Sequence, residues 1–374
     1  MKKQLVVATG LALLSSSAFA TKARLQALGQ DTQGSLFLDD SRSVFLNPAS
    51  LNKMSNYVVT EWGEADSAAD SDSNPHAEGG FFRDGGSINY GLYLGNEYGF
   101  ENKTKTDNDM QASDNNLDLF FAGNMGFDWG ARVSYSASEN EVGGTTPKVE
   151  NDTMGLGLGI NHGKIGAYAN LLLKDESSGS TNSAADKYEA DLGLNLGLSY
   201  DHKNMTFYVD YDKAGHERTV ATAKTEYEQT GIVVGVANKM AMSENSMMFV
   251  DARYWMYEEE TKTTTSTTTE TYTRLPVTIG FETQATSWLA LRASISQNVI
   301  INDYEKEVTG SAKTEKTNDN TTDINAGASL TFGKLMVDGV IGTTGQSRAA
   351  TAKDEGGVLS TDNLMTRVAV SYKF

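Results

Sequence analysis

The chain has 374 residues, among them 36 glycines, 4 prolines and no cysteine, and its formal net charge at pH 7 is −18. This acidity argues against nucleic acid as a partner, because phosphates need a basic surface. The lack of cysteine excludes a disulfide framework, and many glycines with few prolines suit a chain rich in strands.

The first twenty residues have the pattern of a cleaved secretory signal. Lys2 and Lys3 precede a mostly apolar run from Leu5 to Leu14, and the stretch ends in Ala18-Phe19-Ala20. A charged start, a short apolar run and a small-residue ending predict export, with residues 1–20 as the signal peptide and cleavage after Ala20. No later window approaches the ~20 apolar residues that a membrane helix needs.

Residues 21–56 separate the signal from the first predicted strand and contain the stretch DDSRSVFLNPASLNKM. Pro48 lacks a backbone donor and biases Asn47 toward extended geometry, which predicts a turn before the first strand. The sequence Asn47-Pro48-Ala49, after an apolar Val44-Phe45-Leu46, resembles the Asn-Pro-Ala segment near the mature N-terminus of the long-chain fatty-acid transporter family of outer-membrane proteins. The resemblance implies that residues 21–56 form a periplasmic or lumen plug, which in that family lies in a fourteen-stranded barrel.

Residues 57–374 are predicted to form an all-β domain, because apolar and polar residues alternate along them as they do in strands. In YEADLGLNLGLSY, residues 188–200, Leu194 and Leu196 share one side with Tyr188 and Tyr200, and the polar residues share the other. Sixteen such runs are predicted, with fourteen as the alternative count. They lie at 57–64, 77–83, 88–95, 117–124, 127–137, 152–162, 165–174, 187–200, 205–213, 226–238, 246–258, 271–284, 288–299, 322–332, 335–343 and 363–374.

The connections between these runs alternate between short turns and long polar loops, such as those at 214–225 and 300–321. An even number of strands with short periplasmic turns and long outer loops is typical of a transmembrane, antiparallel up-and-down β-barrel in the bacterial outer membrane. The apolar rows are then expected to face lipid and the polar rows the lumen. A soluble β-sandwich would instead bury the apolar rows, and it has no reason to sort its connections by side.

The last residues add separate support for this location. Val368, Val370, Tyr372 and Phe374 alternate up to a terminal phenylalanine. This looks like the C-terminal signature of outer-membrane barrels, which in that class is read by the assembly machinery. We therefore expect Val370, Tyr372 and Phe374 to act as an assembly signal, and the partners to be the lipid bilayer, lipopolysaccharide and the assembly machinery.

No constellation of residues points to catalysis, to a cofactor or to a bound metal. His162 and His202 fall in predicted short turns, and His76 and His216 in long polar loops, so an enzyme is not expected. The loop with Asp107, Asp109 and Asp114 offers oxygen ligands for calcium, but its spacing favours a solvated acidic loop. The glycines of GLGLGIN lie within a predicted strand, where we expect them only to thin the wall.

Charged residues on the polar rows are predicted to line the pore. They are Arg132, Glu189, Asp191, Asp210, Asp212, Asp251, Arg253, Arg274 and Arg292. Neighbouring walls of opposite sign can set a transverse field across water, as in selective pores. The same rows can instead pair across strands and stabilise a filled lumen.

The interpretation that best combines these features is a porin-like channel for passive diffusion of small hydrophilic solutes and ions, because a sixteen-stranded barrel leaves an aqueous channel. Two alternatives stay open: a hatch-plugged transporter of hydrophobic compounds, and a structural or adhesive surface barrel. The sequence does not decide between a monomer and a homo-oligomer.

Overall fold

The computed structural model describes residues 21–63, 77–96, 116–140, 149–181, 184–317, 321–343 and 367–374. The predicted signal peptide, its cleavage after Ala20, His76 and the acidic loop with Asp107, Asp109 and Asp114 lie outside these residues. Within them, no helix is long and apolar enough to cross a membrane.

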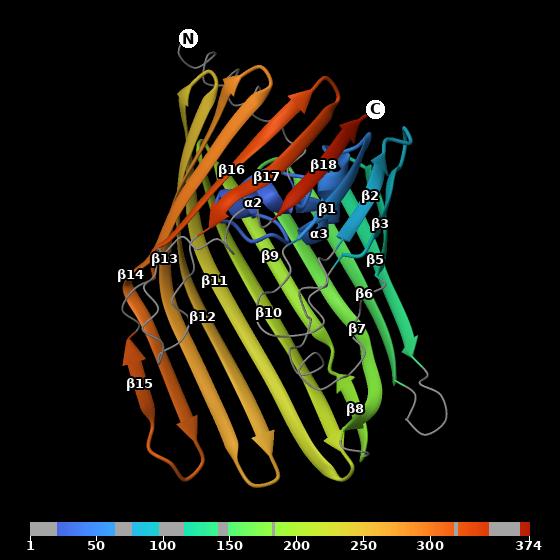
Figure 1. Cartoon of the computed structure of the whole chain (residues 1–374), viewed down its shortest axis with the longest axis vertical. Coiled ribbons are helices and arrows are strands. Elements are labelled where there is room, and N and C mark those ends of the chain that lie inside the picture. Colours follow the sequence, from blue (N-terminus) through green and yellow to red (C-terminus); the bar gives the residue numbers. More distant parts are fainter. Residues whose placement is uncertain are drawn as a thin grey trace.

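The strands form one antiparallel sheet that closes on itself (Figure 1). β1 pairs with both β2 and β18, which joins the two ends of the sheet. β8 and β9 follow one another between β7 and β10, and β15 and β16 both pair with β14, so the strand segments occupy sixteen positions in the wall. The prediction of a sixteen-stranded antiparallel barrel is confirmed.

The strand bounds are β1 Tyr57–Trp62, β2 Ala77–Arg83, β3 Asn89–Leu94, β4 Leu117–Asn124, β5 Asp128–Asn140, β6 Val149–His162, β7 Ile165–Thr181, β8 Ala184–Ala190, β9 Gly193–His202, β10 Met205–Val220, β11 Ala223–Ser243, β12 Ser246–Thr263, β13 Thr267–Thr286, β14 Leu289–Val308, β15 Thr314–Thr317, β16 Asp323–Phe332, β17 Leu335–Thr343 and β18 Val368–Lys373. The helical elements are α2 Lys22–Ala27, α3 Ser43–Leu46 and the 3₁₀ helix η1 Pro48–Asn52.

Apolar side chains point outward and polar ones inward along most strands. On β5, Val133 and Tyr135 are 41 % and 49 % exposed, whereas Arg132 and Ser134 are 5 % and 3 % exposed. A soluble sheet would bury the apolar row, so this arrangement is the one that a barrel in lipid requires.

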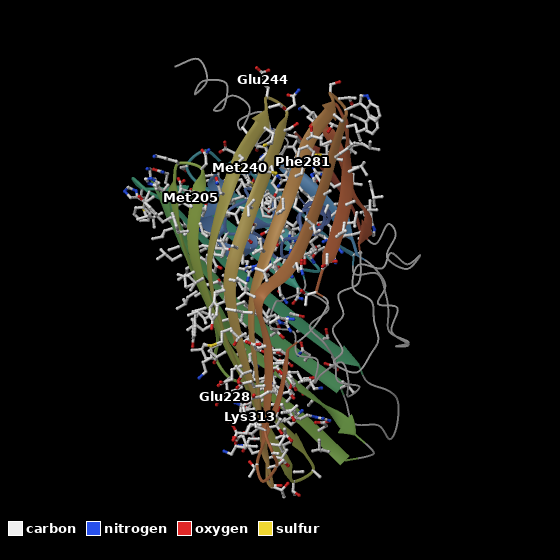
Figure 2. All side chains as sticks on the ribbon, turned by 90° about the vertical axis from the view of Figure 1, so that its left-hand side faces the viewer. Met205, Glu228, Met240, Glu244, Phe281 and Lys313 are labelled. Atoms are coloured by element: carbon white, nitrogen blue, oxygen red, sulfur yellow. The ribbon has the colours of Figure 1, made fainter. Side chains whose placement is uncertain are left out.

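The outward apolar band ends before the strands do. On β12 the outward row runs through Met256 and then changes to Glu258. Figure 2 shows the same change along the wall, with Phe281 in the upper part and Glu228 and Lys313 on the lower extension. An apolar outer band with polar ends is the pattern of a membrane-embedded barrel.

Four of the predicted long loops, at 175–186, 214–225, 259–270 and 300–321, are in fact mainly paired strand. β10 and β11 stay in register from Met205 to a tight turn after Val220, and β14 continues to Val308. These extensions include Thr219, Val220, Tyr304 and Val308, and residues of these types favour strands. As a consequence His216, predicted in a loop, lies on β10, where its ring stacks on Tyr188 and makes a tilted contact with Tyr227.

A break in the wall reverses the faces of β8. β7 has one extra residue at Leu173 in its pairing with β6, and Asp191 and Leu192 separate β8 from β9. Against β10, the register of β8 differs from that of β9 by one residue, and such a shift moves side chains to the opposite face. Tyr188 is therefore buried inside, although the alternation in the sequence had placed it outside with the leucines.

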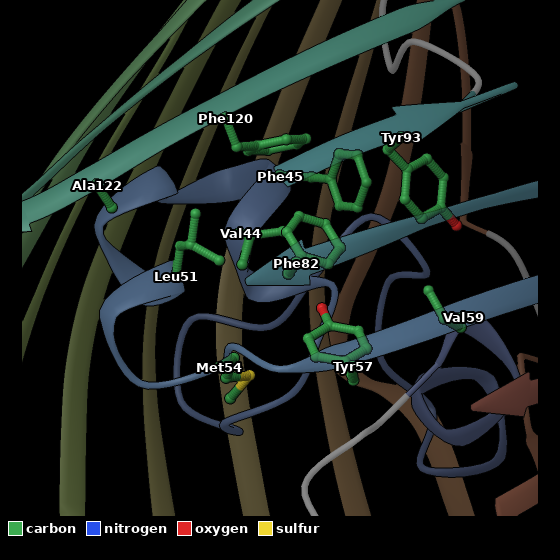
Figure 3. Packing of buried hydrophobic residues seen from close by; sticks show 10 residues of the cluster. All are labelled: Val44, Phe45, Leu51, Met54, Tyr57, Val59, Phe82, Tyr93, Phe120 and Ala122. Carbon is green, nitrogen blue, oxygen red and sulfur yellow. The ribbon is translucent and has the colours of Figure 1, made fainter. Parts of the chain in front are cut away.

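Residues 21–56, which we call the hatch, lie inside the barrel toward the end that Figure 1 draws uppermost. Two apolar clusters join the hatch to the wall. The first is drawn in Figure 3 and contains Val44, Phe45, Leu51, Met54, Tyr57, Val59, Phe82, Tyr93, Phe120 and Ala122. The second contains Leu28, Phe37, Leu38, Tyr208, Ala237, Met247 and Phe249. The buried apolar core thus lies between the hatch and the inner face of the wall.

Candidate functional site: the hatch and the internal cavity

The hatch docks on the wall through Asn47 and the turn that follows it. The Asn47 side chain accepts a hydrogen bond from the Ala49 amide at 3.1 Å and so caps η1, which begins at Pro48. Its Nδ2 donates to the backbone oxygen of Ile160 at 3.2 Å and to Oδ1 of Asn161 at 3.0 Å. The turn predicted at Pro48 is therefore this capped 3₁₀ helix, fixed to the end of β6.

Glycines of the wall make room for this turn. A Cβ on Gly130 would lie 2.2 Å from the carbonyl carbon of Pro48, and a Cβ on Gly159 would lie 2.0 Å from Oδ1 of Asn47. Real side chains do not approach so closely, so only glycine fits at these positions. Gly159 belongs to the GLGLGIN stretch, and its role is to seat the hatch as well as to thin the wall.

Buried ion pairs fix the first helix of the hatch. Arg24 on α2 contacts Glu282 of β13 with 2.7 Å between Nη2 and Oε2. Glu282 also binds Arg292 of β14, and Arg292 in turn contacts Asp338 of β17 at 3.0 Å. All four side chains are at most 5 % exposed. Arg292 was predicted to line the pore; it faces the interior but belongs to this buried network.

A second set of ion pairs joins the hatch, through α2 and through Arg42, to β2. Lys22 contacts Glu78 of β2 at 2.8 Å, and Arg42 contacts the same carboxylate at 3.3 Å. Nη2 of Arg42 donates to Asn96 at 2.6 Å. The partners in these two networks stand far apart in the sequence, so strand alternation alone did not reveal them. The available signal was weak: residues 21–56 hold four basic and three acidic residues, whereas the chain as a whole is acidic.

Asp40 is a buried carboxylate within the hatch itself. It is 0 % exposed, and its Oδ1 accepts a hydrogen bond from the backbone amide of Ser43 at 2.9 Å. Burial raises the pKa of Asp40 to about 7, against the opposing effect of the Arg24 and Arg42 charges. The seated hatch therefore favours the protonated form of this side chain.

Arg132 is the link between the hatch and β4. Its Nη1 donates to the backbone oxygen of Phe45 at 3.2 Å, and its Nε lies 3.7 Å from Oδ1 of Asp118. This residue was predicted to line the pore, and it does face the interior. Its charge is nevertheless neutralised by Asp118, and one of its donors holds hatch backbone.

The remaining residues that were predicted to line the pore and that face the interior lie on β10, β12 and β13. Asp251 accepts a hydrogen bond from Tyr208 at 2.6 Å, and Arg253 lies 3.8 Å from it. Asp210 accepts hydrogen bonds from Tyr168 and from Asn195. Asp212 follows Asp210 on the inward row of β10. On β13, the Arg274 guanidinium lies 4.9 Å from the ring centre of Trp255.

Glu189 and Asp191 were predicted to line the pore, and this prediction is wrong. Glu189 lies on the outer face of β8 and pairs with Lys187 at 2.7 Å. Asp191 lies in the break between β8 and β9, with its Oδ2 2.7 Å from where a Cβ on the outward-facing Gly215 would be. The break reverses the face of β8, which a strictly alternating sequence does not reveal.

The C-terminal residues form a strand, as their alternation indicated, and this strand closes the barrel. β18 pairs with β1 and with β17, and Val370 and Tyr372 lie on its outer row. The amide of Phe374 donates to the backbone oxygen of Asn56 at 3.0 Å. Recognition of Val370, Tyr372 and Phe374 by assembly machinery stays a prediction.

An internal cavity of about 380 Å³ lies between the hatch and the wall. The hatch contributes the apolar residues Leu36, Phe37, Phe45 and Leu46 together with polar residues that include Asp31, and the wall contributes a mixed set of aromatic, apolar and polar side chains. The wall residues of this lining include Arg132, Tyr168, Asn195, Tyr208, Asp210, Asp212, Val233, Arg253, Trp255 and Tyr257. The sequence had predicted Arg132, Asp210, Asp212 and Arg253 on the inward rows, but it singled out none of the aromatic residues of the lining.

A smaller cavity of about 120 Å³ lies on the side of the short turns, where Gly163 and Lys164 line it. It shares Leu36, Phe37 and Leu46 with the larger one. Nζ of Lys239 donates to the Phe37 backbone oxygen at 2.8 Å and so fixes this part of the hatch to β11. These hatch residues therefore form the partition between the two cavities.

No protein-family model and no curated protein sequence matches the chain. Similar solved structures include the monoaromatic hydrocarbon channel CymD, which is 13 % identical, with 93 % of this chain and 96 % of that chain covered and a TM-score of 0.40. A Pseudomonas aeruginosa FadL homologue is 11 % identical over 91 % and 96 %, with a TM-score of 0.41. The Ralstonia pickettii toluene transporter TbuX is 12 % identical over 96 % and 98 %, with a TM-score of 0.38. Likeness at this level carries no argument about function, and the fold rests on the strand pairing of this chain.

Proposed function

We propose that the chain is a bacterial outer-membrane transporter for small, partly hydrophobic molecules, which cross a barrel whose lumen holds the hatch. One observation carries the proposal. The internal cavity is bounded by apolar side chains on both sides, with Phe37 and Leu46 on the hatch and Val233 and Trp255 on the wall. A cavity of a few hundred cubic ångströms with such a lining and a few polar groups is typical of a small-molecule site.

The seated hatch argues against the general porin that composition and strand count favoured. A porin needs a continuous water path, whereas the hatch is joined to the wall by two apolar clusters and by buried ion pairs. Arg292, expected to act on ions in water, is 3 % exposed and is bound by two carboxylates. Hydrophilic solutes should therefore pass slowly while the hatch is seated.

The proposal includes the location and partners inferred from the sequence. The outward apolar band supports a lipid bilayer as the surroundings, with lipopolysaccharide and the assembly machinery as further expected partners. We propose a binding and transport role without catalysis, and no cofactor is part of it.

Binding to the cavity can be followed through one of the four tryptophans. Trp255 lines the cavity, whereas Trp62 and Trp288 are 42 % and 49 % exposed on the outer surface and Trp129 lies on the outward row of β5. A variant with these three changed to phenylalanine keeps Trp255 as the reporter. It would be titrated in detergent with 2-phenylethanol and, as the hydrophilic control, with arabinose.

The proposal predicts a saturable change of Trp255 fluorescence with 2-phenylethanol and none with arabinose. Val233→Phe should weaken the response because it fills cavity space, whereas Val234→Phe should not, because Val234 is 52 % exposed on the outer face. The porin interpretation predicts no saturable response to either compound, together with rapid swelling of protein-containing liposomes in arabinose. The absence of a saturable response together with rapid swelling in arabinose would overturn the proposal.

A further inference from the structure

The lining of the internal cavity has more negative than positive charge that is free to act on a ligand. The two arginines of the lining each have a carboxylate of their own, because Arg132 lies 3.7 Å from Asp118 and Arg253 lies 3.8 Å from Asp251. The acidic residues of the lining are Asp31, Asp210 and Asp212. In the part of the chain that the structure describes, none of these three forms an ion pair.

The two wall carboxylates differ in what already binds them. Asp210 accepts hydrogen bonds from Tyr168 and from Asn195, whose Nδ2 lies at 2.9 Å. Asp212 has no hydrogen-bond donor among the described residues. Its Oδ1 lies only 2.1 Å from the position of a Cβ on Gly231, so the carboxylate extends over a glycine that leaves its space open. Asp212 is thus the free acceptor at this end of the cavity.

Aromatic rings lie directly across the sheet from these carboxylates. In the strand register, Asp212 of β10 lies opposite Gly231 of β11, which lies opposite Tyr257 of β12. Asp210 lies opposite Val233, which lies opposite Trp255. The rings of Trp255 and Tyr257 are stacked, with an interplanar angle of 7°. Neighbouring strands lie about 4.8 Å apart, so the acidic row on β10 and the aromatic row on β12 are about 10 Å apart.

We propose that the cavity selects molecules that join an aromatic ring to a protonated primary amine through a short alkyl chain. This inference rests on the proposed function and names its substrate class. The ring packs on Trp255 and Tyr257, and the ammonium group donates hydrogen bonds to Asp212 while it balances the negative lining. A neutral ring compound gains only the first contact, and a carboxylate meets a lining of the same sign.

Three ligands of nearly equal size test this selectivity: 2-phenylethylamine as the cation, 2-phenylethanol as the neutral compound and 3-phenylpropionate as the anion. Affinities would be measured by calorimetry on the purified full-length protein in detergent at pH 7. A hydrogen bond to a charged group is worth about 1.5–3 kcal/mol, so the amine should bind about tenfold or more tightly than the alcohol. The anion should bind most weakly.

Asp212→Asn should remove most of the preference for the amine and leave the affinity for 2-phenylethanol within about twofold. Glu228→Gln is the matched control, because it removes a carboxylate on the exposed outer side of β11 and should leave all three affinities unchanged. Equal affinities for amine and alcohol in the parent protein would overturn the inference. So would an Asp212→Asn variant that weakens all three ligands equally, because that result indicates a structural role.

The outcome also separates this inference from the proposed function. Saturable binding of 2-phenylethanol that is lost in Val233→Phe, without preference for the amine, would refute the selectivity and leave the transporter proposal standing. Binding of none of the three ligands, with rapid passage of arabinose, would refute both.

Discussion

Gly130 of β5 offers a direct way to disturb the seat of the hatch without touching its charges. The change Gly130→Ala adds one methyl group, which would lie 2.2 Å from the carbonyl carbon of Pro48 and 2.3 Å from the amide nitrogen of Ala49. These are backbone atoms, so no rotation of a side chain can relieve the contact. η1 must move away from the wall by more than an ångström to reach an ordinary separation of about 3.4 Å or more.

Such a displacement breaks the contacts that Asn47 makes with the wall. Its hydrogen bonds to Ile160 and Asn161 have lengths of 3.2 and 3.0 Å, and neither survives a shift of that size. Each hydrogen bond contributes about 0.5–1.5 kcal/mol, and a buried donor left unpaired costs about 1–3 kcal/mol. We expect the free energy that favours docking of the hatch on the wall to fall by about 2–4 kcal/mol. This change raises the population of the undocked hatch about 30-fold to 700-fold.

Single-channel recording in planar bilayers measures this population as the fraction of time spent in a conducting state. Gly179→Ala is the control, because a Cβ on that wall glycine would meet its nearest atom only at 3.7 Å, an ordinary contact. The expected result is frequent opening in Gly130→Ala and rare opening in Gly179→Ala and in the parent. If the Gly130→Ala channel opened as rarely as the parent channel, and its hatch were as resistant to protease, the docking of η1 on this glycine would be refuted.

Three further changes test the charge in the hatch, the lipid-facing wall and the terminal residue. The folded-state pKa of Asp40, about 7, lies above the unfolded value near 3.8, so its contribution to stability should fall as the pH rises from about 4 to about 7, and Asp40→Asn should flatten this dependence in urea unfolding. Leu196→Arg places a charge on the lipid-facing row and should reduce folding into vesicles by about 2–4 kcal/mol, whereas Glu258→Arg, beyond the apolar band, should not; equal yields would contradict the side assignment. Deletion of Phe374 removes the hydrogen bond to Asn56 and the terminal aromatic, and should lower the amount of barrel in outer-membrane fractions; undiminished amounts would make the terminal resemblance incidental.

The sequence predicted the inner and outer faces of most wall strands, because the alternation of apolar and polar residues within a single strand indicates them. Alternation such as Val133 and Tyr135 against Arg132 and Ser134 needs no knowledge of the rest of the fold. The same reasoning failed at Glu189, because a break of two residues reverses the face while the letters continue to alternate.

The site was harder to predict because its contacts join distant parts of the chain. Arg24 and Glu282 are 258 residues apart, and no local pattern links them. Sequence reasoning left open whether the charge rows line water or stabilise a filled lumen, and the hatch decides this for Arg132 and Arg292, which bind hatch backbone or buried carboxylates. Charged residues of the cavity lining were predictable from the inward rows of the strands. The position of the cavity was not, because it depends on how far the hatch extends into the barrel.

In the function proposed above, molecules cross this barrel by way of the internal cavity between Phe37 and Trp255. Uptake of radiolabelled 2-phenylethanol and arabinose into a compound-trapping liposome system, with parent, Val233→Phe and Val234→Phe proteins compared, tests it most directly. We expect saturable uptake of the aromatic compound that Val233→Phe lowers at least severalfold and Val234→Phe leaves unchanged, with little uptake of arabinose. Rapid, non-saturable uptake of arabinose that neither substitution changes would contradict it.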